Sequence, residues 1–87
     1  MKNSTKSRKP QDVMLRKTDK DWVLIAVNEH SHGIAFTVSR LPKEIEGKTL
    51  YRLYSEESHI VRKGIIRDGI RGFGVHVYAT SRRFEVE

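Results

Sequence analysis

The sequence predicts an all-β protein, an antiparallel β-sandwich of about seven to eight strands with a disordered basic N-terminal arm. From residue 11 onward, apolar residues fall in short runs separated by turn-forming residues, roughly every 8 to 12 positions, with almost no helical periodicity. The 87 residues include 5 Leu, 7 Ile, 8 Val and 3 Phe, enough for one small core. The chain has no cysteine, which excludes disulfides, thiolate metal ligands and cysteine nucleophiles.

The first ten residues differ in composition from the rest. They contain four basic residues, no acidic residue and one apolar residue, Met1, and they end at Pro10. We therefore expect residues 1–10 to be a flexible basic tail and residues 11–87 to be a single β-sandwich domain. Of the 17 basic residues, 4 lie in the tail, which leaves 13 against 11 acidic residues in the domain. Most of the net positive charge thus belongs to the tail.

The N-terminal half predicts a hairpin followed by a third strand. Residues 12–17 and 22–27 form two strands joined by the polar turn 18–21. The second run, Trp-Val-Leu-Ile-Ala-Val, predicts a central strand buried on both faces. After a polar loop, residues 34–38 alternate between large and small side chains, which places Ile34, Phe36 and Val38 on one face.

The connection that follows is polar, and residues 43–47 have room for one helical turn at most. Residues 50–54 predict the next strand. Residues 60–66 predict another, which Gly64 bends, and Arg67-Asp68-Gly69 has the composition of a tight turn.

The clearest late strand covers residues 75–79. Its alternation predicts that Val75 and Val77 fill the core between two sheets, with the polar tips of His76 and Tyr78 at the other face. Phe84 and Val86 suggest a final edge strand.

The residue types favour a protein that is not an enzyme and needs no cofactor. Glycoside hydrolysis requires two carboxyl groups that face each other, whereas the acidic residues fall mostly in predicted turns: Asp19, Asp21, Glu44, Glu46, Glu56, Glu57 and Asp68. His30 and His32 have no third ligand at a recognisable spacing, so we expect no metal site. No nucleophile elbow or phosphate-binding loop occurs. No apolar run is long enough to span a membrane, so we expect no membrane partner.

Two groups of residues are candidates for binding. Tyr51 and Tyr54 could stack on a sugar ring, although on a regular strand they face opposite sides and one of them is expected in the core. Lys63, Arg67 and Arg71 share one strand parity, which predicts a one-sided basic stripe. That stripe supports the alternative function of a small basic module that binds nucleic acid or another polyanion.

Two stretches together resemble a known family. Residues 21–28 with 34–38 resemble a strand pair in the C-terminal β-sandwich accessory domain of glycoside hydrolases. Residues 65–78, above all the Val-His-Val-Tyr run within 74–78, are similar to the closing motif of the same domain. The resemblance covers roughly residues 12–80.

The resemblance implies a non-catalytic domain that packs against a (β/α) barrel, stabilises it and contacts polysaccharide weakly. The chain has no room for the barrel itself, so we expect either an excised piece or a stand-alone copy. In both cases the face that would meet the barrel is expected to be apolar. It would be open to water or to a second copy of the chain.

Overall fold

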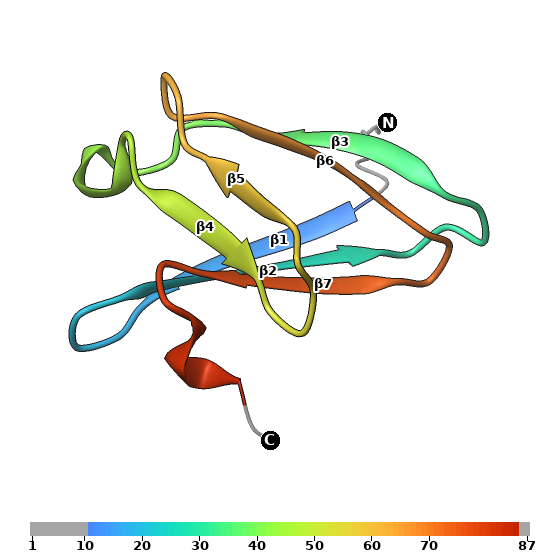
Figure 1. Ribbon diagram of the computed structural model, residues 1–87. Coiled ribbons are helices and arrows are strands. Elements are labelled where there is room, and N and C mark those ends of the chain that lie inside the picture. The colour runs from blue at the N-terminus through green and yellow to red at the C-terminus, as the bar shows by residue number, and fades with distance from the viewer. Residues whose placement is uncertain (1–10, 86–87) are drawn as a thin grey trace.

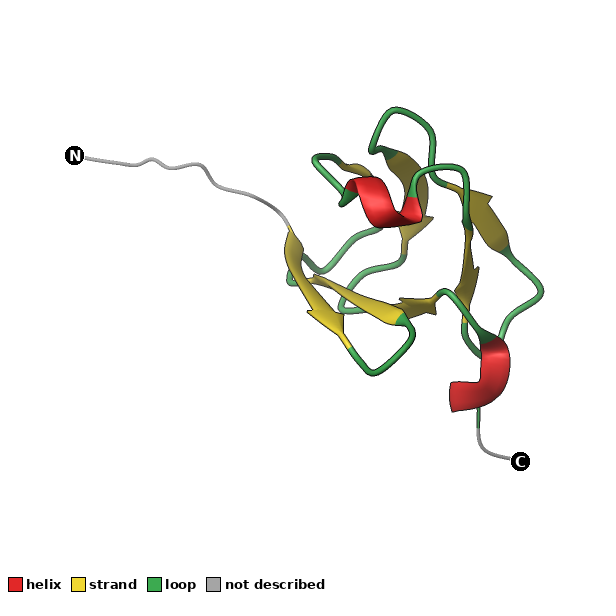
Figure 2. Ribbon diagram, turned by 90° about the vertical axis from the view of Figure 1, so that its left-hand side faces the viewer, coloured by secondary structure: helices red, strands yellow, loops and turns green. Residues whose placement is uncertain are grey.

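The computed structural model describes residues 11–85, and within this range the protein has seven strands, two 3-10 helices and no α-helix. The expected tail, residues 1–10, and Val86 lie outside the described residues. The strands are β1 (Gln11–Lys17), β2 (Trp22–Asn28), β3 (Ile34–Val38), β4 (Thr49–Arg52), β5 (Ser58–Ile60), β6 (Ile66–Ile70) and β7 (Val75–Ala79). The 3-10 helices are η1 (Lys43–Ile45) and η2 (Arg82–Phe84), which lie outside the sheets at different ends of the molecule (Figure 2).

The strands form two antiparallel sheets, which confirms the predicted all-β, antiparallel class. The larger sheet has the strand order β1-β2-β7-β4-β5, and the smaller sheet consists of β3 and β6. Figure 1 shows β3 and β6 lying over the layer formed by β1, β2 and β7, with β4 and β5 slanting between the two layers. No helix in the described range is long and apolar enough to cross a membrane.

One hydrophobic core fills the space between the sheets. Its members come from both layers: Leu24, Ala26, Phe36, Val38, Leu41, Ile45, Leu50, Val61, Ile66, Ile70 and Tyr78. The predicted alternation in β3 is confirmed, because Phe36 and Val38 are buried and Thr37 between them is exposed. The prediction that β2 is buried on both faces is wrong. Only Leu24, Ala26 and Asn28 of β2 are fully buried, since the second sheet covers one face of the strand.

The predicted hairpin and the predicted single helical turn are both present. The Thr18 amide donates to the Asp21 carbonyl at 2.8 Å and closes the turn between β1 and β2. The helix η1 is one 3-10 turn, and its Ile45 side chain is buried in the core.

Two predictions for the segment 60–70 are wrong. The expected bent strand is interrupted by a two-residue turn at Lys63 and Gly64, where Arg62 and Ile65 exchange both backbone hydrogen bonds, at 3.2 and 3.0 Å. Both central residues have positive φ, 55° and 69°, which defines a type I′ turn. The expected turn at residues 67–69 is instead part of β6, where Asp68 pairs with Phe36. The strand continues because the carboxylate of Asp68 is bound inside the fold.

The expected edge strand at Phe84 is also absent from the described residues. The chain forms η2 there, and the Ser81 hydroxyl accepts a hydrogen bond from the Arg83 amide at 3.1 Å. A serine at this position favours a helix start over a strand.

Candidate functional site

The orientation of β7 is the reverse of the one predicted from its alternation. His76 and Tyr78 point into the space between the sheets, whereas Val75 is 56% exposed and Val77 is half-buried on the outer side. The register explains the reversal, because Tyr78 pairs with Leu24, whose side chain is in the core. Polar side chains are tolerated there because a carboxylate lies opposite them.

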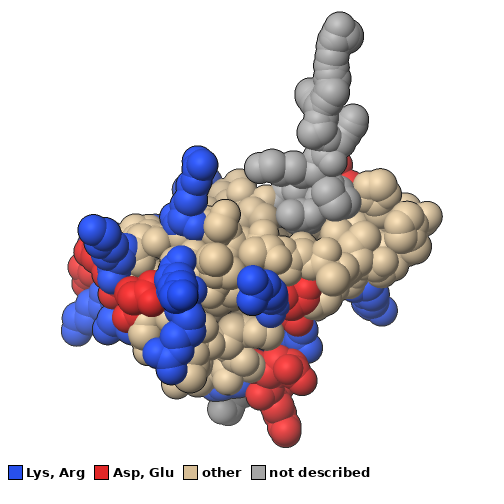
Figure 3. Space-filling model, turned by 90° about the horizontal axis from the view of Figure 1, so that it is seen from above, with Lys and Arg blue, Asp and Glu red and all other residues tan. Residues whose placement is uncertain are grey.

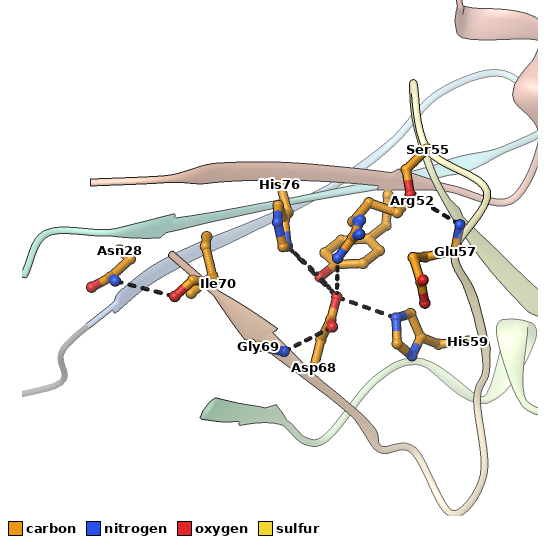
Figure 4. Close-up of polar contacts among 10 residues, drawn as sticks. Asn28, Arg52, Ser55, Glu57, His59, Asp68, Gly69, Ile70 and His76 are labelled. Carbon is orange, nitrogen blue, oxygen red and sulfur yellow. Dashed lines mark hydrogen bonds and ion pairs between the residues drawn. The ribbon is translucent and has the colours of Figure 1, made fainter. Parts of the chain in front are cut away.

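That carboxylate is the centre of a group of five side chains, which we call the Asp68 cluster: Arg52, His59, Asp68, His76 and Tyr78. The Tyr78 hydroxyl donates to Asp68 Oδ2 at 2.5 Å, and Arg52 Nη1 donates to the same oxygen at 3.1 Å. The backbone amide of Gly69 donates to Oδ1 at 2.7 Å. Figure 4 shows Arg52, His59 and His76 directed toward the Asp68 carboxylate.

The two imidazoles approach the carboxylate from different sides (Figure 4). His59 Nε2 lies 3.2 Å from Oδ2, within ion-pair distance. It forms no hydrogen bond with any described residue, Asp68 included. His76 Nδ1 lies 3.1 Å from the Tyr78 oxygen. Since the single Tyr78 proton is donated to Asp68, we assign a proton to Nδ1 of His76, which donates to Tyr78.

The Asp68 cluster connects the two sheets. Arg52, His59 and the two β7 residues come from β4, β5 and β7 of the larger sheet, while Asp68 comes from β6 of the smaller sheet. Charge-assisted hydrogen bonds of this kind are stronger than neutral ones. The cluster therefore fixes the position of β6 over the larger sheet.

The surroundings shift the pKa values of Asp68 and Tyr78 in opposite directions. Burial alone would raise the pKa of Asp68, but hydrogen bonds from Tyr78 and Gly69 and the charges of His59 and Arg52 outweigh it, so the pKa lies below its usual value. Burial, followed by the hydrogen bond to the Asp68 carboxylate, raises the pKa of Tyr78 well above its usual value. Near neutral pH the pair therefore stays as a carboxylate and a neutral phenol.

His76 makes the stability of the fold sensitive to pH. Burial, together with the charge of Arg52, lowers its pKa below the usual value of 6.5. The unfolded chain thus binds a proton at His76 more readily than the folded chain does. The contribution of neutral His76 to the free energy of unfolding is fully present above pH 6.5, and it is lost as the pH falls from 6.5 through the folded-state pKa. Asp68 adds a second loss below its usual pKa of 3.8. Urea unfolding as a function of pH measures both losses.

The variant His76→Gln separates the two effects. The variant has no imidazole at position 76. The loss of stability near pH 6.5 is therefore expected to shrink, while the loss that Asp68 causes at lower pH remains. An unchanged pH profile in this variant would contradict the assignment to His76.

No protein-family model, curated protein or solved structure is significantly similar to this chain. The chemistry of the site therefore rests on the side chains alone. Both oxygens of Asp68 already accept hydrogen bonds, and the cluster has no second carboxylate. The hydrogen bonds make the cluster a polar connection between the two sheets.

The structure places Tyr51 and Tyr54 near the same 3-10 helix, η2. The Arg82 guanidinium lies 5.1 Å from the centre of the Tyr51 ring, and Arg82 pairs with Glu85 at 3.0 Å. Glu85 in turn accepts from the Tyr54 amide at 2.5 Å. The prediction that one of the tyrosines is in the core is wrong, because Tyr51 is half-buried and Tyr54 is 67% exposed. A role in sugar binding stays a prediction.

The predicted stripe of Lys63, Arg67 and Arg71 is not continuous. The type I′ turn separates Lys63 from β6, so the shared strand parity no longer applies. Lys63 and Arg67 lie along one groove at the start of β6, whereas Arg71 follows the other end of that strand. All three side chains are exposed.

The two histidines of the polar loop stack edge to face, with ring centres 5.3 Å apart, and both are exposed. In the part of the chain that the structure describes, no group of three His, Asp or Glu side chains is arranged to hold a metal ion. The expectation that the chain binds no metal stays a prediction.

Asn28 is a structural residue that the sequence analysis did not single out. It is 1% exposed and links two loops. Its Nδ2 donates to the carbonyls of His32 and Arg71, both at 2.9 Å, and its Oδ1 accepts from the His30 amide at 2.9 Å. A buried asparagine at the end of an apolar strand was the available signal, since a buried amide requires partners.

Proposed function

We propose that this protein is a non-catalytic accessory β domain that packs against a (β/α) barrel catalytic domain of the glycoside hydrolase type. Weak contact with polysaccharide is part of the proposal. The single observation that carries it is an apolar surface on the outer side of the larger sheet. We call this surface the outer face, and it consists of Met14, Val23, Ile25, Val27, Val75 and Val77.

The register places these six side chains together. Val27 pairs with Val75 and Ile25 pairs with Val77, while Ile25 also pairs with Met14 on its other side. Met14 is 49% exposed and Val75 is 56% exposed. Burying a side chain of this kind contributes roughly 1.5 to 3 kcal/mol, so covering the outer face would stabilise a complex.

The opposite side of the molecule has a different character. The outward positions of the smaller sheet are Ala35 and Thr37 in β3 and Arg67 and Gly69 in β6, and all four are exposed. These residues are small, polar or charged. The outward side of the smaller sheet therefore lacks the apolar character of the outer face, and a contiguous apolar surface is what another domain would cover.

The Asp68 cluster supports the non-catalytic part of the proposal. Glycoside hydrolysis needs one carboxylic acid and one carboxylate on either side of the bond that breaks. Asp68 is the one carboxylate in the cluster, and its oxygens are occupied by Tyr78, Arg52 and Gly69. The cluster is consistent with a domain whose polar interior holds the sheets together.

Substitution on the outer face tests the proposal. The isolated chain is expected to associate weakly with itself, because two outer faces can cover each other in the absence of the barrel. Val75→Lys introduces a charge at an exposed position and is expected to abolish this association without loss of stability. Ala35→Lys makes a similar change on the smaller sheet and is the matched control. Sedimentation velocity over a range of concentrations measures the association.

A panel of chromogenic glycosides provides the second measurement. No turnover is expected from the purified chain. Turnover that persists after repeated purification would overturn the proposal, as would a wild-type chain that stays monomeric at the highest soluble concentration.

A further inference from the structure

A groove beside the turn between β5 and β6 carries three positively charged side chains. It has a volume of about 690 Å³ and is lined by Arg62, Lys63 and Arg67, with Ile60 and Ile65 among them. The three basic side chains are exposed. None of them forms an ion pair with a residue in the described range 11–85.

A fourth cation lies next to this turn. Arg40 is exposed, and its Cα is 3.9 Å from the point where a Cβ on Gly64 would lie. The amide of Leu41, the next residue, donates to the Gly64 carbonyl at 3.0 Å. Figure 3, seen from the side of the smaller sheet, shows Lys and Arg side chains gathered at one end of the molecule, with Asp and Glu side chains among them.

The backbone conformation of two of these cations is unfavourable for their residue type. Lys63 has φ of 55° and Arg40 has φ of 61°, in the left-handed region where glycine and asparagine are favoured. The first central position of a type I′ turn strongly prefers asparagine, aspartate or glycine. The fold itself therefore gives no reason for a lysine at position 63. A lysine held there at a cost of roughly 1 to 3 kcal/mol is consistent with a role in binding.

Glu46 anchors the backbone of the turn. One carboxylate oxygen accepts from the Lys63 amide at 2.6 Å and the other accepts from the Gly64 amide at 2.8 Å. Both oxygens are thus engaged with the backbone, so Glu46 fixes the turn without forming an ion pair with the Lys63 side chain. Holding the turn in this way limits the backbone entropy that is lost on binding.

We propose that this groove binds an acidic polysaccharide through its carboxylate or sulfate groups. Arg40, Arg62, Lys63 and Arg67 supply the positive charge, and Ile60, which is 47% exposed, offers an apolar contact for the C–H face of a sugar ring. Single-stranded nucleic acid is disfavoured, since no Phe, Tyr or Trp in the described range lines the groove to stack on a base. The one imidazole in the lining, His59, is half-buried beside Asp68. The groove lies apart from the outer face, and its test does not depend on self-association.

The variant Lys63→Asn tests this proposal. Asparagine suits the type I′ turn, so the thermal stability is expected to stay the same or rise. Affinity for heparin, a sulfated probe, or for polygalacturonate, a carboxylated probe, is expected to fall about tenfold, because one charge-assisted contact is lost. The slope of the logarithm of the binding constant against the logarithm of the salt concentration is expected to decrease in magnitude by about one. Isothermal titration at several salt concentrations provides these values, and the two probes distinguish sulfate from carboxylate recognition.

Two variants with the same loss of charge are the controls. Arg71→Gln removes a cation at the far end of β6, and Lys9→Gln removes one from the first ten residues. Neither is expected to change the affinity. Equal weakening in all three variants would overturn the proposal, because binding would then follow net charge alone.

Two further results would contradict the acidic polysaccharide. One is the absence of binding to both probes at low salt. The other is tighter binding to a DNA duplex or a single-stranded oligonucleotide than to either polysaccharide. Neutral dextran, which carries no charged group, is expected to show no binding in this assay.

Discussion

Replacing Asp68 with asparagine is expected to lower the free energy of unfolding by about 3 kcal/mol. The change removes the negative charge that Arg52 and the surrounding imidazoles face, while the Arg52 side chain is only 22% exposed. It also removes the strong acceptor of the Tyr78 hydroxyl. The melting temperature is expected to fall by more than about 10 °C. Chemical denaturation and calorimetry at neutral pH measure both changes.

Asp19→Asn is the matched control, because Asp19 is exposed in the turn between β1 and β2. Its effect is expected to stay within about 0.5 kcal/mol. An equal effect of the two substitutions would mean that the Asp68 cluster contributes no more than net charge, and the structural role assigned to it would be wrong.

Replacing Asn28 with alanine is expected to cost a similar amount, about 3 kcal/mol. The substitution leaves the His30 amide and the carbonyls of His32 and Arg71 without the partner that Asn28 provides. These groups lie in the two loops that join β2 to β3 and β6 to β7. Both loops are expected to open together.

Hydrogen exchange measured residue by residue tests this coupling. In Asn28→Ala, the Phe73 amide, which donates to the His30 carbonyl at 2.8 Å, is expected to lose protection. The amides between β4 and β5 are expected to change only as far as global stability changes, and they serve as the internal reference. Loss of protection in one loop alone would contradict the link through Asn28.

Local sequence patterns predicted much of the fold. The alternation in β3, the run of apolar residues in β2 and the polar turn at residues 18–21 each depend on near neighbours, and each predicted element is present. The errors concern choices that distant residues make. The alternation of β7 is compatible with either orientation, and its pairing with Leu24 of β2 decides which side of the strand is buried.

The Asp68 cluster shows the same limit for the site. Asp68-Gly69 is a common turn sequence, and the sequence alone did not reveal that Arg52, His59 and Tyr78 meet at this carboxylate. One local signal was present, since Ile66, Asp68 and Ile70 alternate and two of them are apolar. Read as a strand, this pattern places Asp68 inside, where a carboxylate requires partners. The basic groove was found in part, because the sequence offered its lining residues Lys63 and Arg67 as candidates but not Arg40.

The position of β7 in the larger sheet has a consequence for synthesis of the chain. This last described strand lies between β2 and β4. Among the described strands, β7 alone connects the β1–β2 hairpin to β4 and β5. During translation, the earlier strands therefore leave the ribosome before the sheet can close. The nascent chain is expected to stay sensitive to proteases until residues 75–79 have emerged, and then to become resistant in a single step.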